Sequence, residues 1–174
     1  RNLEYNGEDV EVVPDIPNEI LRRIDLVRKK DKTDFIVVEV GGTVGEYQNV
    51  LFLEAARMLK LKHPGDVLFV LVSYLPIPGK IGEMKTKPTQ YASRTLNSAG
   101  LQADFIVCRS ELRIDDKRRE KLATFCNIEK EAAIAAPDVD SVYEVPINFI
   151  KDKFDLKILK RLGLKPKSED LREW

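Results

Sequence analysis

The pattern of hydrophobic and polar positions alternates between short apolar runs and longer amphipathic segments. Apolar runs at residues 35–40, 67–72 and 105–108 are each short and unbroken, which is typical of strands buried inside a parallel sheet. Two shorter runs, at residues 133–135 and 142–145, predict further strands. The chain therefore has five segments that predict strands.

The segments between these runs have apolar residues at helical spacing, which predicts helices with one buried face. Residue 100 is a glycine suited to end the third of these helices, Asp115 is suited to begin the fourth, and residues 154–162 predict a last helix. The side chains expected to share one helix face are Ile20, Ile24 and Val27 in the first helix and Leu51, Ala55 and Met58 in the second. In the third, Tyr91, Thr95 and Leu96 lead to Gly100, and the fourth is expected to bury Leu122 and Phe125.

Strands that alternate with helices predict an α/β fold with a mostly parallel sheet flanked by helices. Ligands of such sheets bind beyond the carboxyl ends of the strands, which lie here after Val40, Val72 and Cys108. Two long connections, residues 73–87 and 109–114, begin at these ends, and long connections in compact domains are often functional.

Composition narrows the classes of function. The chain has 174 residues, of which 43% are hydrophobic and 33% are charged, and its 29 basic and 29 acidic side chains balance. This is the profile of one folded domain, without the basic excess of a nucleic-acid binder or an apolar run that could span a membrane. Cys108 and Cys126 lie in apolar surroundings, which predicts buried thiols rather than disulfides and favours a reducing, cytoplasmic setting.

The first candidate site is residues 39–45, Glu-Val-Gly-Gly-Thr-Val-Gly. A carboxylate at the end of an apolar strand, here Glu39, is suited to hold Mg²⁺ in proteins that handle phosphate. The glycines would let backbone N–H groups approach an anion, and Thr43 would add a hydroxyl. The alternative is a strand-end acid followed by an ordinary glycine turn, and the residues alone leave both interpretations open.

The second candidate site is residues 82–90, in which two lysines and two threonines precede a predicted helix with Pro88 in its first turn. A helix N-terminus attracts anions, and Lys85 and Lys87 would make it a site for a polyanion such as a triphosphate. Gln90 offers both a donor and an acceptor for a base edge. The alternative is a solvated loop that caps a helix.

The mixed charges of residues 115–121 predict the exposed face of a helix, from which a single lysine could still reach a phosphate. His63 precedes Pro64 in a predicted loop without a nucleophile or base beside it, and we interpret it as structural.

Several of these segments, in this order, resemble the N-terminal synthetase domain of CTP synthases. Residues 39–45 are similar to the family's Gly-Gly-Thr-Val-Gly signature, and residues 82–90 look like its Gly-Glu-x-Lys-Thr-Lys-Pro-Thr-Gln motif. Further matching segments are residues 107–110, 121–126, 138–141 and 143–146. The resemblance runs from about Tyr5 to the last helix and implies a P-loop NTPase fold of the dethiobiotin synthetase type.

The resemblance also implies an activity. Members of this family use ATP to phosphorylate O4 of UTP, and ammonia from glutamine then displaces the phosphate to give CTP. Glu39 would be the Mg²⁺ ligand and, with Lys85 and Lys87, part of the catalytic site. The residues implied to bind UTP or CTP are Glu46, Tyr47, Gln48, Lys85, Thr86, Lys87, Pro88, Thr89, Gln90 and Lys121, and those implied to bind ATP are Pro137, Asp138 and Val139.

The chain departs from the family's pattern in two places. Glu46, Tyr47 and Gln48 replace a usual Asp-Ile-Glu, so a charge is lost and a larger side chain is introduced, which could alter nucleotide affinity or inhibition by CTP. Asp15 stands where the family commonly has a histidine between proline and isoleucine.

The family's phosphate loop, Gly-x-x-x-x-Gly-Lys-Ser/Thr, does not occur in these 174 residues, and neither does its glutaminase domain. Because the sequence begins at Arg1, we expect residues 1–174 to be part of a synthetase domain that is inactive alone, with residues 164–174 as a tail towards the glutaminase domain. Family enzymes are homotetramers with nucleotide sites between subunits. The alternatives are therefore a non-catalytic module that binds pyrimidine nucleotides, or a piece that serves assembly.

Overall fold

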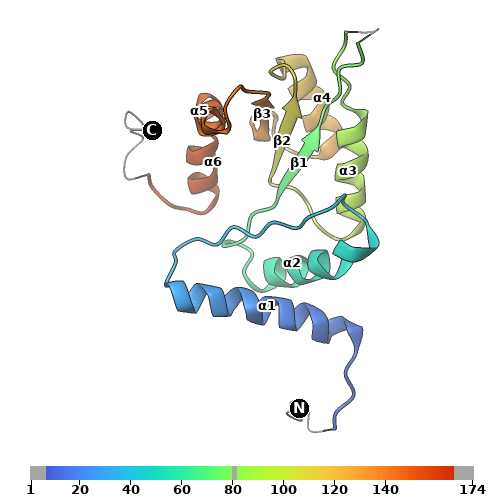
Figure 1. Ribbon diagram of the computed structural model, residues 1–174, viewed down its shortest axis with the longest axis vertical. Coiled ribbons are helices and arrows are strands. Elements are labelled where there is room, and N and C mark those ends of the chain that lie inside the picture. The colour runs from blue at the N-terminus through green and yellow to red at the C-terminus, as the bar shows by residue number, and fades with distance from the viewer. Residues whose placement is uncertain (1–6, 80–81, 167–174) are drawn as a thin grey trace. The chain divides into compact units, whose positions relative to one another are not determined.

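The computed structural model describes residues 7–79 and 82–166, which divide into two compact units (Figure 1). The first unit is Arg1–Pro64 and the second is Gly65–Trp174. The tail expected at residues 164–174 lies outside the described residues from residue 167 onward.

The first unit consists of two helices that pack against each other. Helix α1 spans Val12–Asp31, and a 3₁₀ turn η1 at Tyr47–Asn49 leads into helix α2 at Val50–Lys62. Ala55 of α2 is fully buried as expected, whereas Val27 of α1 is exposed, so the predicted core face of α1 is wrong at its C-terminal end. Basic side chains fill the last turn of α1, where they complement the negative end of the helix dipole.

The strand predicted at residues 35–40 is wrong. The chain runs through these residues without regular secondary structure, and the Val37 side chain is 96% exposed. An apolar run indicates that a segment is suited to burial in a sheet, but a strand also needs a neighbour that pairs with its backbone N–H and C=O groups. No strand in the described part of the chain pairs with this run.

The second unit contains a three-stranded parallel sheet in the order β1–β2–β3, which confirms the predicted α/β fold with its parallel sheet flanked by helices. The strands are β1 at Val70–Tyr74, β2 at Phe105–Ser110 and β3 at Ala133–Pro137. The register pairs Val70 with Phe105 and Ile106 with Ala133. The apolar run at residues 67–72 thus becomes strand later than predicted.

Helices cover both faces of this sheet (Figure 1). Helices α3 (Lys87–Ser98) and α4 (Asp116–Cys126) lie on one face, and α5 (Val145–Lys151) and α6 (Phe154–Arg161) lie on the other. A 3₁₀ turn η2 at Lys130–Ala132 precedes β3. The last helix therefore falls where its apolar spacing predicted it.

The strand predicted at residues 142–145 is wrong, because these residues form a 3₁₀ turn, η3, at Val142–Glu144 and the start of α5. The Ser141 hydroxyl accepts a hydrogen bond from the Tyr143 N–H, and Pro146 stands in the first turn of α5, where its missing N–H costs nothing. These local features begin a helix, and they outweigh the strand preference of the apolar residues around them.

The core of the second unit forms between the sheet and the last two helices. The Phe154 ring lies edge-on to the rings of Phe105 and Phe149, with centroids 5.3 Å apart in each pair. Val107 and Ile134 complete this buried cluster from β2 and β3. Aromatic pairs in this geometry add to the stabilisation that burial alone provides.

The ends of α3 and α4 confirm two predictions from single residues. Gly100 adopts φ +77° directly after the C-cap of α3, a conformation that favours glycine. The Asp115 carboxylate caps α4 by accepting a hydrogen bond from the Arg118 N–H. Within α4, Leu122 is fully buried as expected, but Phe125 is 60% exposed, so that part of the prediction is wrong.

Both cysteines are buried and free, as predicted. Burial raises the pKa of the Cys108 thiol to about 12, so this thiol stays protonated at neutral pH.

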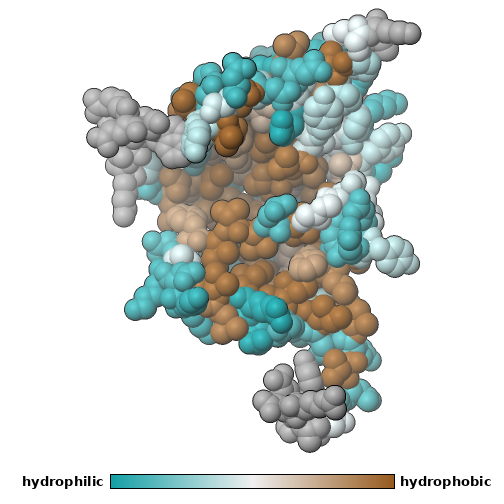
Figure 2. Space-filling view, viewed as in Figure 1, coloured by the Kyte–Doolittle hydropathy of each residue, from teal (hydrophilic) through white to brown (hydrophobic). Residues whose placement is uncertain are grey.

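The face of β1 that carries Val70, Val72 and Tyr74 remains exposed, and Figure 2 shows an apolar surface over this strand. Among the described residues, no helix is long and apolar enough to cross a membrane.

Candidate functional site

The candidate residues divide between the two units. Glu39 and residues 46–48 belong to the first unit, whereas residues 85–90, Lys121 and residues 137–139 belong to the second.

In the first unit, the glycine segment forms a closed turn. The Glu46 N–H donates to the Thr43 carbonyl at 3.0 Å, and the Asn49 side-chain amide donates to the same oxygen at 2.6 Å. Gly42 has φ +82°, a conformation that L side chains rarely adopt, so this turn favours glycine. Asn49 was not predicted as part of this segment.

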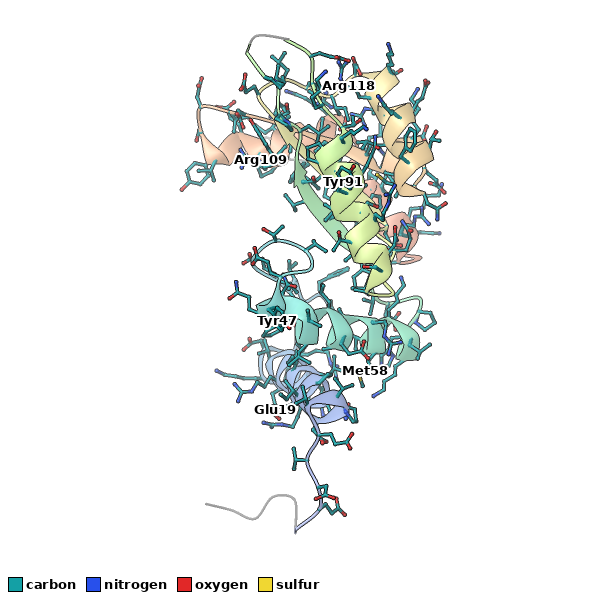
Figure 3. All side chains as sticks on the ribbon, turned by 90° about the vertical axis from the view of Figure 1, so that its right-hand side faces the viewer. Glu19, Tyr47, Met58, Tyr91, Arg109 and Arg118 are labelled. Carbon is teal, nitrogen blue, oxygen red and sulfur yellow. The ribbon has the colours of Figure 1, made fainter. Side chains whose placement is uncertain are left out.

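The three residues that depart from the family's pattern lie directly after this turn. The Gln48 amide donates to the Glu46 carboxylate at 3.1 Å. Together with a hydrogen bond from Thr43, it lowers the pKa of Glu46 below its usual value. The Tyr47 side chain is 100% exposed at the start of the helical segment (Figure 3). Glu46 is thus an ionised carboxylate held by its neighbours, and Tyr47 is free to contact a ligand.

The surroundings of Glu39 allow a limited test of the expected Mg²⁺. Glu39 is exposed, and the described residues include no group of three or more metal-ligating side chains. Mg²⁺ that acts on nucleotides is commonly held by one or two carboxylates together with phosphate oxygens and waters. The single carboxylate of Glu39 fits a metal that arrives with a nucleotide, rather than a metal held by protein ligands alone.

In the second unit, the lysine-containing loop folds back at the carboxyl end of β1. The Ser110 hydroxyl at the end of β2 donates to the Leu75 carbonyl at 2.8 Å, and the Lys85 N–H donates to the Pro76 carbonyl at 2.9 Å. The first bond fixes the start of the loop to the sheet, and the second joins the end of the loop to its start. The loop therefore lies at the edge where parallel sheets bind their ligands.

The two threonines of the loop support its structure. Thr89 is fully buried, and its hydroxyl lies 2.8 Å from the Ser73 hydroxyl on β1. Thr86 is also buried and accepts a hydrogen bond from the Gln90 side chain at 3.0 Å. Lys87, in contrast, is exposed and is the first residue of α3. Thr89 thus holds the first turn of α3 against β1, and Thr86 orients the Gln90 side chain.

Cationic side chains surround the carboxylate of Glu83. The Lys85 Nζ atom lies 2.6 Å from one carboxylate oxygen, and a guanidinium nitrogen of Arg118 lies 3.7 Å from the other. The hydrogen bond from Lys85 lowers the pKa of Glu83, and the positive charges of Lys85, Arg118 and Lys121 add to this effect. Lys85 and Arg118 are the two cations paired with Glu83, whereas Lys121 of α4 acts on it only through its charge.

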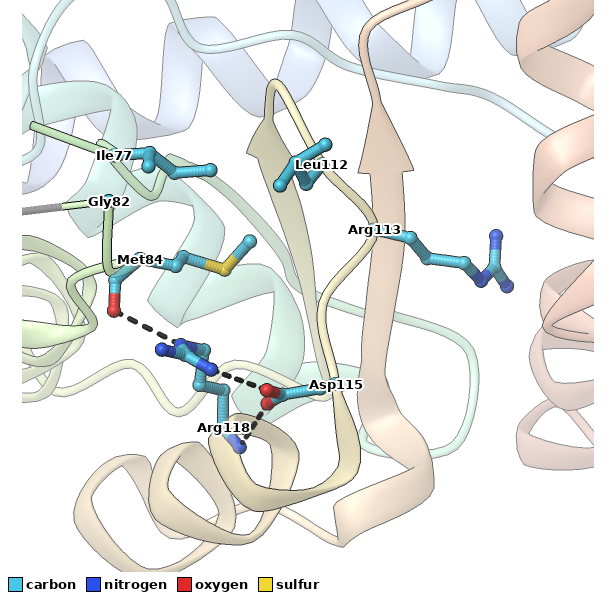
Figure 4. A pocket seen from close by; sticks show the side chains of 7 residues that line it. All are labelled: Ile77, Gly82, Met84, Leu112, Arg113, Asp115 and Arg118. Carbon is cyan, nitrogen blue, oxygen red and sulfur yellow. Dashed lines mark hydrogen bonds and ion pairs between the residues drawn. The ribbon is translucent and has the colours of Figure 1, made fainter. Parts of the chain in front are cut away.

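Arg118 is the member of this cluster that the sequence did not predict. Its Nε donates to the Met84 carbonyl at 3.1 Å, and its guanidinium pairs with Asp115, the cap of α4 (Figure 4). Arg118 lies one helical turn before Lys121, and this spacing was the feature of the sequence that could have predicted Arg118 on the same helix face. A hollow of about 120 Å³ is lined by Ile77, Gly82, Met84, Leu112, Arg113, Asp115 and Arg118.

The segment implied to bind ATP lies at the carboxyl ends of β2 and β3. Pro137 ends β3, and the Asp138 N–H donates to the Ser110 carbonyl at 2.9 Å. Arg109 of β2, which was not predicted as a site residue, pairs with the Asp138 carboxylate at 2.8 Å. Val139 is half-buried beside them.

Comparison with known proteins gives the same family over nearly the whole chain. The sequence model of the family described as CTP synthase N-terminus matches residues 1–164. The chain is 42% identical to the CTP synthase of Caldanaerobacter subterraneus over an alignment of 175 positions. It is 45% identical to the CTP synthase of Methanocaldococcus jannaschii over an alignment of 177 positions. Each alignment covers 100% of this chain but only 33% and 32% of the relative, so the chain spans about a third of the length of these curated relatives. The chain belongs to the CTP synthase family and corresponds to its N-terminal domain.

Proposed function

We propose that this chain binds the triphosphate of UTP, and of the product CTP, as part of an enzyme that uses ATP and glutamine-derived ammonia to convert UTP to CTP. Membership of the CTP synthase family supports the reaction class. The observation that supports the assignment of the site is the pairing of Lys85 and Arg118 with a single carboxylate, Glu83, shortly before the N-terminus of α3.

The physical basis is charge neutralisation. A nucleoside triphosphate carries several negative charges, and phosphoryl transfer depends mainly on positioning these groups and neutralising them. Lys87, exposed at the first position of α3, adds a further cation where the helix dipole is positive. Gln90 is half-buried one turn later, within reach of the same end of the helix.

The remaining assignments follow the resemblance. Glu39 would hold Mg²⁺ that enters with the nucleotide, and the metal would neutralise phosphate charge. Residues 46–48 would contact the pyrimidine nucleotide, and residues 137–139 would contact ATP. In the whole enzyme these segments would act together in a homotetramer.

We expect the 174 residues by themselves to bind nucleotide without turnover, because they contain no phosphate loop. A second candidate function is a non-catalytic pyrimidine-nucleotide sensor, which the exposed Tyr47 and the neutral Gln48 favour. Conversion of UTP to CTP by the natural polypeptide would decide against the sensor.

Calorimetric titration with UTP and CTP, each with and without Mg²⁺, tests the proposed site. We expect Lys85→Ala, Lys87→Ala and Lys121→Ala each to weaken UTP binding by about 1.5–3 kcal/mol, because each removes a charge-assisted contact to phosphate. Lys117→Ala is the matched control, since Lys117 is an exposed lysine one turn before Lys121 on α4. Equal UTP affinity in wild type and all three variants would leave assembly as the role of this chain.

The metal site has its own test. We expect Glu39→Gln to weaken UTP binding in the presence of Mg²⁺ and to leave binding without Mg²⁺ nearly unchanged, because the glutamine cannot offer a charged ligand to the metal. Glu8→Gln, at another exposed glutamate of the first unit, serves as the control. The same loss with and without Mg²⁺ would show that Glu39 is not a metal ligand.

A further inference from the structure

Glu83 stands out because a carboxylate occupies the position where the proposed function needs an anion. It lies in the loop before α3, with Lys85 at 2.6 Å and Arg118 at 3.7 Å. Its own negative charge cancels part of the positive charge that the cluster would offer to a phosphate. The cluster therefore has a counter-ion from within the same loop.

Arg118 is held in place whether or not Glu83 is present. It donates to the Met84 carbonyl and pairs with Asp115, and its side chain is mostly buried. Glu83 makes fewer contacts, and its side chain is 57% exposed. Movement of the Glu83 side chain into solvent would leave Arg118 paired with Asp115, whereas movement of the Arg118 side chain would break its ion pair with Asp115 and its hydrogen bond to Met84.

On the basis of the proposed function, we propose that the Glu83 carboxylate acts as a displaceable counter-ion, which occupies the cation cluster of Lys85 and Arg118 until a polyphosphate replaces it. On binding, Lys85 exchanges Glu83 for a phosphate oxygen, and Glu83 turns to solvent. Arg118 is then a further cation of the same anion site. The cations are neutralised both in the free chain, by Glu83, and in the complex, by the phosphate. Because the phosphate must displace Glu83, the affinity for anions is lower than the cations alone would give.

The exchange predicts an unusual sign for a substitution inside a binding site. Glu83→Gln removes the competing charge and keeps the size of the side chain, so anion binding should become tighter. Exposed ion pairs are individually weak, and an affinity gain of about three- to tenfold is expected at low salt. The gain should shrink as salt rises, because the lost repulsion between Glu83 and the phosphate is screened.

The test is calorimetric titration of the chain with inorganic tripolyphosphate at several salt concentrations, with wild type, Glu83→Gln and Glu111→Gln compared. Glu111 is an exposed glutamate of the same unit, and among the described residues it has no ion-pair partner, so it controls for the loss of one negative charge. We expect Glu111→Gln to bind within about twofold of wild type. Circular dichroism of all three chains checks that they are equally folded.

Tighter binding by Glu83→Gln alone, with a gain that falls as salt rises, supports the exchange. Equal or weaker binding overturns it, since Glu83 would then be neutral for binding or would orient Lys85 for the ligand. Absence of tripolyphosphate binding in every chain overturns it as well. If the chain binds tripolyphosphate as expected but does not bind UTP, the exchange is supported and the proposed function is wrong. If UTP binding depends on Lys85 but does not change in Glu83→Gln, the proposed function is supported and the exchange is wrong.

Discussion

Asp152 joins three segments of the second unit through one carboxylate. It follows α5, its side chain is only 9% exposed, and it accepts a hydrogen bond from the Ala135 N–H of β3 at 2.6 Å. Arg119 of α4 pairs with it at 2.9 Å, and Arg113 pairs with it from the loop after β2. No sequence motif marks this residue, because its partners lie 17 to 39 positions away in the chain.

We expect Asp152→Asn to lower the free energy of unfolding by about 2–3 kcal/mol, because it leaves the mostly buried Arg119 guanidinium without its counter-charge. Urea unfolding at pH 7 measures this loss. Asp140→Asn, at an exposed position, is the control and should change stability by less than about 0.5 kcal/mol. Similar losses in the two variants would contradict the role assigned to Asp152.

The same carboxylate predicts a dependence of stability on pH. Burial raises the pKa of Asp152, but the Ala135 N–H and the charges of Arg119 and Arg113 outweigh it and hold the pKa below the ordinary value. A lowered folded pKa gives stability that is fully present above the unfolded value of about 3.9 and is lost as pH falls through the folded value. The stability difference between wild type and Asp152→Asn should therefore be constant from about pH 5 to 7 and should shrink below about pH 4.

At the scale of elements, the start of α4 links helix stability to the candidate site. Asp115 caps the helix through the Arg118 N–H and also pairs with the Arg118 guanidinium. The same guanidinium holds the loop that carries Lys85, through the Met84 carbonyl. A cap that the sequence predicted from one residue thus also orients a cation that the sequence missed.

We expect Asp115→Ala to destabilise the chain by about 1–2 kcal/mol, because an unoccupied N-cap leaves a backbone N–H without a partner. Asp116→Ala removes a neighbouring acid of the first turn and should cost less than about 0.5 kcal/mol, since Asp116 is exposed and makes only a long ion pair with Lys130. Thermal unfolding followed by circular dichroism compares the two. A larger loss at Asp116 than at Asp115 would refute the cap.

At the scale of the whole molecule, the second unit has an aromatic core of its own. Phe154 of α6 packs edge-on against Phe105 of β2 and Phe149 of α5, which joins the last helices to the sheet. Helices α5 and α6, which contribute to this cluster, lie on the sheet face opposite α3 and α4 (Figure 1). The core thus stabilises the sheet whose carboxyl edge carries the candidate site.

We expect Phe154→Ala to cost about 3–5 kcal/mol of unfolding free energy, because it opens a cavity between α6 and the sheet. Phe125→Ala, at the exposed phenylalanine of α4, is the control and should cost less than about 1 kcal/mol. Urea unfolding measures both. Equal losses would mean that Phe125 is packed in solution, as the helical spacing had predicted.

The elements predicted correctly are those with strong local signals. Strands β2 and β3 follow from short apolar runs, and the ends of α3 and α4 follow from Gly100 and Asp115. The errors fall at apolar segments, which can form either a strand or another structure depending on their surroundings. Residues 35–40 and 142–145 are both apolar enough for a strand, but the first has no partner strand among the described residues and the second is preceded by a helix cap.

The sequence by itself determined the family, the α/β class and the lysine-containing segment, because these depend on ordered motifs and on patterns within single segments. Only the tertiary structure decided which side chains surround Lys85. Glu83 and Arg118 lie 35 positions apart and meet because the loop after β1 folds onto the start of α4. Contacts of this kind depend on the packing of distant segments, and no periodicity within either segment encodes them.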